Sequence, residues 1–129
     1  MIVYTDGACL GNPGPMGAGI VFVEGGKAVK EFSIPLGQGT NNRAEYLAAI
    51  HALKEAKKLG HTTLVLRSDS SLLIKQLRGE YRIKDAKLRE LKAEADSLLK
   101  GMTVQFEWVS REDNEHADEL SKKAAGMKK

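Results

Sequence analysis

Residues 40–60, TNNRAEYLAAIHALKEAKKLG, decide the fold class because they are the first part of the chain with a helical rather than an alternating pattern. Strong helix formers run from Asn42 to Leu59, and Gly60 supplies a stop. Asn41 or Asn42 can cap the start. One face of this helix has seven positions, six of them apolar and four of them alanine: Glu45, Ala48, Ala49, Ala52, Leu53, Ala56 and Leu59. Such a face is expected where a helix lies close against a sheet.

Three strands are predicted before this helix. The first is Met1–Cys9, and the turn-forming residues 10–15 make a fixed loop after it. The second is Gly17–Glu24, and Gly25-Gly26 marks a hairpin turn into the third, Lys27–Leu36. Consecutive strands of this kind indicate an antiparallel meander.

Two further strands and three further helices are predicted after residue 60. They are a buried strand Thr62–Ser68, a short helix Ser70–Leu77, a longer helix Asp85–Leu99, a strand Thr103–Val109 and a final helix from about Asn114 to Ala125. The order β-β-β-α-β-α-α-β-α predicts an α/β fold with a mixed five-stranded sheet flanked by helices. Three antiparallel strands are followed by two parallel ones, since the later strands need helical crossovers.

The composition predicts an ordinary globular protein. The 129 residues are expected to form one domain at 1–126, with 127–129 as a frayed C-terminal tail. A hydrophobic content of 42% argues against disorder, and no apolar run approaches the ~18–20 residues that cross a bilayer. No signal peptide is expected, and the single cysteine, Cys9, fits a reducing compartment, so we expect a cytoplasmic protein. We also expect a monomer. A net charge of +3 agrees with a polyanionic partner without establishing one.

Four acidic residues occupy positions that a structural role explains poorly. Asp6 lies within a strand, which disfavours aspartate. Glu45 interrupts an apolar helix face, where a lone buried carboxylate costs several kcal/mol unless it is paired. Asp69 follows a buried strand, at the end where open α/β sheets place their ligands, and Asp118 is near the start of the last helix. Three have structural alternatives: Asp69 as a helix cap, Asp118 as a partner of the helix dipole, and Asp6 as the start of a turn.

Convergence of these four carboxylates would require a cation. Two unit charges ~5 Å apart repel by roughly 3 kcal/mol at an effective dielectric of 20. Oxygen ligands without a cysteine or histidine cluster favour Mg²⁺, with Mn²⁺ as the alternative. Four carboxylates balance two divalent ions, which suits hydrolysis of a phosphodiester by two metals. The predicted catalytic and metal-ligating residues are therefore Asp6, Glu45, Asp69 and Asp118.

Four motifs, in this order along the chain, resemble those of the type 1 ribonuclease H (ribonuclease HI) family. They are residues 5–15 (TDGACLGNPGP), residues 40–45 (TNNRAE), Ser68-Asp69-Ser70 and residues 114–120 (NEHADEL), so the resemblance covers essentially the whole chain. It implies a ribonuclease H-like fold and an endoribonuclease that cleaves the RNA strand of RNA/DNA hybrids, leaving 5′-phosphate and 3′-hydroxyl ends. It places the catalytic metal ligands at the same four acids.

The resemblance also implies substrate contacts. Cys9, Asn12, Asn41 and Ser71 would lie along the minor groove of the hybrid, where hydrogen bonds to 2′-hydroxyl groups separate RNA from DNA. Thr40 would help to hold a phosphate of the DNA strand. From the sequence alone, Asn12 is equally a turn residue, and Asn41 equally a helix cap.

The chain departs from many family members before the fourth acid. Their flexible loop carries a histidine, whereas Ser110–Asp113 contains none. His116 precedes Asp118 by two residues, about 200° around a helix, so it cannot simply replace that group. Either metals and water suffice, or Arg111 or Glu112 contributes to leaving-group chemistry.

A second departure is the absence of a basic protrusion, because residues 78–84 are too short for an added helix. No separate N-terminal hybrid-binding domain is expected either. A smaller basic patch, or simply a solvated helix face, is formed by Lys75, Arg78, Arg82, Lys84 and Lys87. Modest affinity with steep salt dependence is therefore predicted. One alternative is a broader nuclease that also cuts double-stranded RNA. Another is a non-catalytic hybrid-binding module, although the four acids would repel the phosphates of a bound hybrid and weaken its binding.

Overall fold

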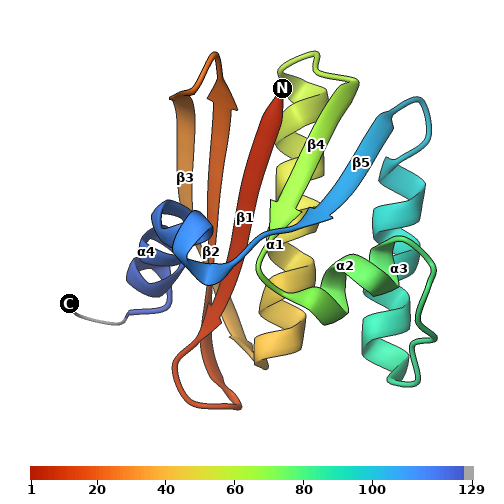
Figure 1. Cartoon of the computed structure of the whole chain (residues 1–129). Helices are drawn as coiled ribbons and strands as arrows, with labels where there is room; N and C mark the ends of the chain where they lie inside the picture. The colour runs from red at the N-terminus through yellow and green to blue at the C-terminus, as the bar shows by residue number, and fades with distance from the viewer. Residues whose placement is uncertain (127–129) are drawn as a thin grey trace.

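A single five-stranded sheet organises the computed structural model, which describes residues 1–126 (Figure 1). The strands are β1 (Ile2–Cys9), β2 (Gly14–Glu24), β3 (Lys27–Gly39), β4 (Thr63–Ser68) and β5 (Thr103–Trp108). The helices are α1 (Asn41–Lys58), α2 (Ser71–Leu77), α3 (Ala86–Leu98) and α4 (Glu115–Ala124), with a 3-10 helix η1 (Arg111–Asn114) before α4. The tail predicted at 127–129 lies outside the described residues.

The sheet order β3-β2-β1-β4-β5 confirms the predicted mixed architecture. β1 pairs antiparallel with β2, and β2 with β3, whereas the β1–β4 and β4–β5 pairs are parallel. The β1–β4 ladder ends where Tyr4 pairs with Arg67, but the β1–β2 ladder continues as far as Cys9 and Met16. The carboxyl ends of β1 and β4 therefore lack mutual pairing, and such an end is where open α/β sheets bind ligands.

Helices cover both faces of the sheet: α4 packs on β1, β2 and β3, and α1 packs on β1 and β2 from the opposite side (Figure 1). The alanine-rich face of α1 is buried as predicted, whereas Leu59 is 38% exposed and ends the helix as its C-cap. Tyr46 and Ile50 are also buried, and α1 packs against α3 and α2 as well as the sheet. None of the described helices combines the length and apolar character that a membrane crossing needs.

Several predicted boundaries move because side chains cap the helices. The expected cap at Asn41 or Asn42 is wrong: Thr40 caps α1, and its hydroxyl accepts a hydrogen bond from the N–H of Arg43. Asp85 likewise caps α3 rather than beginning it.

Two strands and the last helix also differ from their predicted extents. β2 begins at Gly14, inside the predicted loop, and β3 continues to Gly39 because the antiparallel ladder between them persists to these residues. The final helix, predicted from about Asn114 to Ala125, is α4 (Glu115–Ala124), and the 3-10 helix η1 (Arg111–Asn114) that precedes it was not predicted.

Candidate active site

Three of the four predicted acids converge where β1 and β4 separate. Asp6 lies on β1, two residues beyond the last β1–β4 pair, and Asp69 directly follows β4. Glu45 comes from the first turns of α1. One carboxylate oxygen from each lies within 4.8 Å of the others. The sheet and α1 thus bring three carboxylates to one point, as a cation site requires.

Glu45 reaches this point because Gly7 has no side chain. A Cβ at Gly7 would lie 2.2 Å from the carbonyl carbon of Ala44 and 2.3 Å from the nitrogen of Glu45. α1 therefore packs directly against the backbone of β1. The N–H of Gly7 donates a hydrogen bond to Oε1 of Glu45, which orients that carboxylate.

Two more glycines bring α4 against the opposite face. A Cβ at Gly19 would lie 2.0 Å from the carbonyl oxygen of Ala117, and one at Gly17 would lie 2.3 Å from that of Ser121. The hydroxyl of Ser121 is fully buried and donates to Oδ2 of Asp6. Ser121 orients a predicted ligand, yet its sequence position among small apolar residues gave no signal of this contact.

Asn114 joins the two separated strands. Its side-chain amide, 1% exposed, donates to the carbonyl oxygen of Thr5 over 3.0 Å and to Oδ2 of Asp69 over 3.4 Å. Its own Oδ1 has no hydrogen-bond partner within residues 1–126. Asn114 was predicted only as the start of the last helix. Its burial and its two contacts come from segments distant in the sequence, so no sequence signal indicated this role.

Asp69 is not a helix cap. The cap of α2 is Ser70, whose hydroxyl accepts from the N–H of Leu73 over 3.2 Å. The main-chain oxygen of Asp69 accepts from the indole nitrogen of Trp108 over 3.1 Å, and its carboxylate lies in the group of three acids. The structural alternative weighed for Asp69 is therefore wrong.

Asp118 lies in the first turn of α4 and outside the group of three, although it lines the same cleft. Its Oδ2 is 2.9 Å from Nζ of Lys122. Because Asp118 lies near the N-terminus of α4, its negative charge also interacts favourably with the helix dipole, and this is compatible with a role as a metal ligand.

Burial and mutual repulsion disfavour ionisation of the converging acids. Burial raises the pKa of Asp6 to about 7, and the charges of Asp69 and Asp118 add to this, against the hydrogen bond from Ser121. Burial and the neighbouring Asp6 also raise the pKa of Glu45 well above its usual range. A divalent cation would relieve both effects. The all-oxygen donor set fits a hard ion such as Mg²⁺ or Mn²⁺.

The acids line a cleft of about 340 Å³. Its lining consists of Asp6, Gly7, Ala8, Cys9, Asn41, Asn42, Glu45, Asp69, Ser70, Arg111, Asp118 and Lys122. Two predicted substrate residues, Cys9 and Asn41, are among them. Asn12 is adjacent, because its Oδ1 accepts from the N–H of Asn41 over 3.1 Å.

The other predicted substrate residues have different surroundings. Thr40 caps α1 beside the cleft, and Ser71 opens α2, where Ser70 rather than Ser71 contributes to the cleft lining. The thiol of Cys9 points inward to the carbonyl oxygens of Gly14 and Gly39. Only the main chain of Cys9 is therefore available to a ligand.

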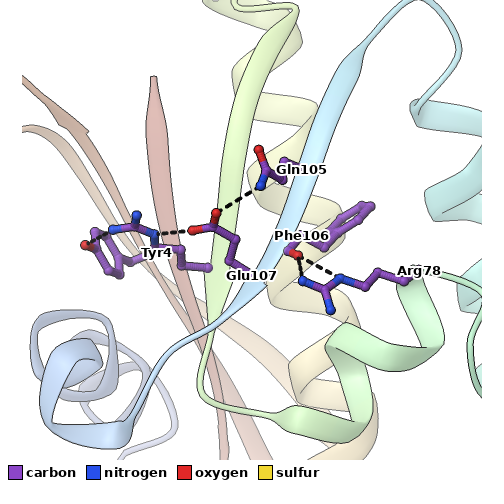
Figure 2. A network of polar contacts seen from close by, with 6 residues as sticks. Tyr4, Arg78, Gln105, Phe106 and Glu107 are labelled. Carbon is purple, nitrogen blue, oxygen red and sulfur yellow. Dashed lines mark hydrogen bonds and ion pairs between the residues drawn. The ribbon is translucent and has the colours of Figure 1, made fainter.

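The histidine and the basic patch are engaged elsewhere. His116 contacts Glu31 on β3, so it does not reach the acids. The guanidinium of Arg78 donates to the carbonyl oxygen of Phe106, as Figure 2 shows. Lys75 lies 4.9 Å from the ring of Tyr81. Part of the predicted patch thus serves internal contacts.

Comparison with known proteins agrees with this geometry. The RNase H family model matches residues 1–126. Ribonuclease HI of Halobacterium salinarum is 43% identical over 126 residues, which are 94% of this chain and 62% of that protein, so the chain spans about three fifths of this relative. The crystal structure of RNase H1 from the same archaeon has a TM-score of 0.93 at 42% identity, covering 97% of this chain and 96% of that one. LC11-RNase H1, isolated from compost and solved in complex with an RNA/DNA hybrid, has a TM-score of 0.91 at 36% identity, covering 97% and 96%.

Proposed function

Because this chain belongs to the type 1 ribonuclease H family, we propose that it is an endoribonuclease that cleaves the RNA strand of RNA/DNA hybrids. Hydrolysis of the phosphodiester would leave 5′-phosphate and 3′-hydroxyl ends. The observation that carries the proposal is the convergence of Asp6, Glu45 and Asp69 at the separated ends of β1 and β4. The hybrid bound by LC11-RNase H1 supports the substrate class.

Asp6, Glu45, Asp69 and Asp118 would hold two Mg²⁺ ions, with Mn²⁺ as the alternative. Bound ions would activate the attacking water and stabilise the leaving 3′-oxygen. The protein's own contribution is to hold the carboxylates in place before the ions arrive. Gly7 donates to Glu45, and Ser121 to Asp6, and these hydrogen bonds favour one orientation of each carboxylate.

The rim of the cleft would distinguish RNA from DNA. The hydrogen bond from the main-chain N–H of Asn41 to Asn12 links the loop after β1 to the start of α1, so Asn12 lies next to Asn41, which lines the cleft. We assign to them, with main-chain groups of Cys9 and the hydroxyl of Ser71, hydrogen bonds to 2′-hydroxyls of the RNA strand. Thr40 would contact a DNA phosphate.

Arg111 is the proposed cationic group near the leaving oxygen. It lines the cleft together with Asp69 and Asp118, whereas Glu112 does not. Of the two residues weighed for leaving-group chemistry, the cleft lining therefore favours Arg111. A guanidinium there can bind the phosphate or stabilise the charge that develops on cleavage.

The decisive experiment is cleavage of end-labelled RNA/DNA, RNA/RNA and DNA/DNA duplexes with Mg²⁺, Mn²⁺ or EDTA. We expect cutting of the RNA strand of the hybrid with either metal and none with EDTA. Comparable cutting of RNA/RNA would indicate the broader nuclease. Binding of the hybrid without cleavage under any metal would indicate a binding module and overturn the proposal. The cytoplasmic location expected from Cys9 stays a prediction.

A further inference from the structure

Asp118 differs from the other three acids in its surroundings. Oxygens of Asp6, Glu45 and Asp69 lie within 4.8 Å of one another, whereas Asp118 lies outside that group. Its carboxylate is instead 2.9 Å from the ammonium group of Lys122, one turn further along α4. The fourth carboxylate therefore has a counter-ion supplied by the protein itself.

The ammonium group of Lys122 is free to change partners. The side chain of Lys122 is 53% exposed and lines the cleft, and that of Asp118 is 23% exposed. An exposed ion pair of this spacing on a helix is weak, because water solvates both charges and the long side chain loses entropy in one geometry. Another anion entering the cleft can therefore compete with Asp118 for Lys122.

In a nuclease, the anion that enters this cleft is a phosphate of the bound strand. A lysine ammonium is a flexible point charge well suited to phosphate. A metal ion bound to Asp118 would, in turn, compete with Lys122 for the negative charge of that carboxylate, because two cations beside it repel each other. Binding of a phosphate to Lys122 and binding of a metal ion to Asp118 therefore favour each other, since each removes one partner from the Lys122–Asp118 ion pair.

We propose that Lys122 is an exchangeable counter-ion, which neutralises Asp118 in the free protein and transfers to a substrate phosphate as Asp118 takes up a divalent cation. The inference rests on the proposed function of this cleft. It makes binding of the metal and binding of the hybrid mutually reinforcing, because a coupling between two sites is reciprocal.

The first test is a calorimetric titration of Mn²⁺ into the substrate-free protein. Lys122→Ala is expected to bind Mn²⁺ about fivefold more tightly, because a positive charge next to the site is removed. Lys122→Arg keeps the counter-ion and should stay within about twofold of the wild type. Lys123→Ala is the matched control, since Lys123 is an exposed neighbour on α4 that does not line the cleft.

The second test measures binding of an RNA/DNA hybrid by fluorescence anisotropy in EDTA, where no cleavage occurs. Lys122→Ala should weaken binding about threefold to fivefold and reduce the slope of log K against log salt by about one, because one phosphate contact is lost. Lys123→Ala should change neither quantity.

The outcomes separate this inference from the proposed function. If the wild type binds no divalent ion, the metal-dependent nuclease itself is overturned. If it binds Mn²⁺ but Lys122→Ala binds no more tightly, only the counter-ion role is overturned. Unchanged hybrid binding by Lys122→Ala would overturn the transfer to phosphate.

Discussion

Two neighbouring sites along β1 and β4 differ in how their charged side chains are stabilised. Tyr4 and Arg67 are partners across β1 and β4, and Asp6 and Asp69 come two residues later on each chain segment. Nη1 of Arg67 donates to the Tyr4 hydroxyl over 2.8 Å, and Nε donates to Glu107 over 3.0 Å. In Figure 2 the network continues from Glu107 to Gln105. Charges in this network have internal partners.

The acids two residues further on have no cationic partner among residues 1–126: Asp6 accepts a hydrogen bond from Ser121 and Asp69 accepts one from Asn114, and both donors are neutral. The pKa of Arg67 is raised because its hydrogen bonds to Tyr4 and Glu107 favour the charged form. The pKa of Asp6 is raised because burial and neighbouring acids disfavour the charged form. The same direction of shift thus marks a stabilised charge at Arg67 and a destabilised one at Asp6. The network around Arg67 contributes to stability, whereas ionisation of the acids around Asp6 would be favoured by a bound cation.

The largest expected effect is on catalysis. Asp69→Asn should reduce single-turnover cleavage of the hybrid by about a thousandfold or more, because metal-ion catalysis contributes several kcal/mol. Asp96→Asn, at an exposed acid of α3 that pairs with Lys92, is the control and should retain full activity. An unchanged cleavage rate for Asp69→Asn would show that the acid site is not the catalytic site.

The next effect is on the stability of the metal-free protein. Asp6 binds its proton more tightly in the folded state, with a pKa of about 7 against an ordinary value of 3.8. Its contribution is therefore fully present below about pH 4 and is lost as the pH rises toward and through 7. Glu45 acts in the same direction. Urea unfolding in EDTA should show a loss on the order of a few kcal/mol over this range.

Two controls isolate the acids in that measurement. Mg²⁺ should restore stability at pH 8, because a bound cation favours the ionised carboxylates. Asp6→Asn should reduce the pH dependence in EDTA and leave the part that Glu45 contributes. A metal-free protein whose stability rises steadily from pH 5 to 8 would contradict the raised pKa of both acids.

A smaller effect is expected where α1 meets β1. Gly7→Ala should lower the free energy of unfolding by about 1–3 kcal/mol, because its Cβ would overlap the backbone at Ala44. Cleavage should also fall, since α1 carries Glu45 away from Asp6. The two losses are measured by urea unfolding and by hybrid cleavage. Normal stability together with normal activity would show that Gly7 does not set the position of Glu45.

The smallest effect belongs to the paired charges. Arg67→Met should cost about 0.5–1 kcal/mol in unfolding free energy and leave cleavage within about twofold, because the network is partly exposed and does not line the cleft. A double-mutant cycle with Glu107→Gln measures the coupling between the two side chains. A large loss of cleavage would mean that the two regions are not independent.

The sequence predicts the elements and their order because periodicity is a local property. The alternating strands, the alanine face of α1 and the Gly25-Gly26 turn all appear as expected. Helix starts are less predictable, since neighbouring polar residues compete for one cap. Ser70 takes the position that Asp69 could have filled.

Contacts between distant segments could not be predicted. The motifs identified Asp6 and Glu45. The hydrogen bond from Gly7, the neighbour of Asp6, to Glu45 joins residues 38 positions apart, and no local pattern predicts it. The hydrogen bond from Ser121 to Asp6 spans 115 residues. Asn114 shows the same limit, because its role follows only from the separation of β1 and β4. A single sequence shows which polar residues interrupt an apolar pattern, and the fold determines which of them come into contact.

The central position of β1 has a consequence for heat inactivation. β1 is hydrogen-bonded on both sides, to β2 and β4, and covered by α1 and α4, so it belongs to the part of a domain that opens only with the whole. Asp6 lies on this strand rather than on a mobile loop. Activity and tertiary structure should therefore be lost in one cooperative transition on heating, without an earlier phase in which a folded protein has already lost its site.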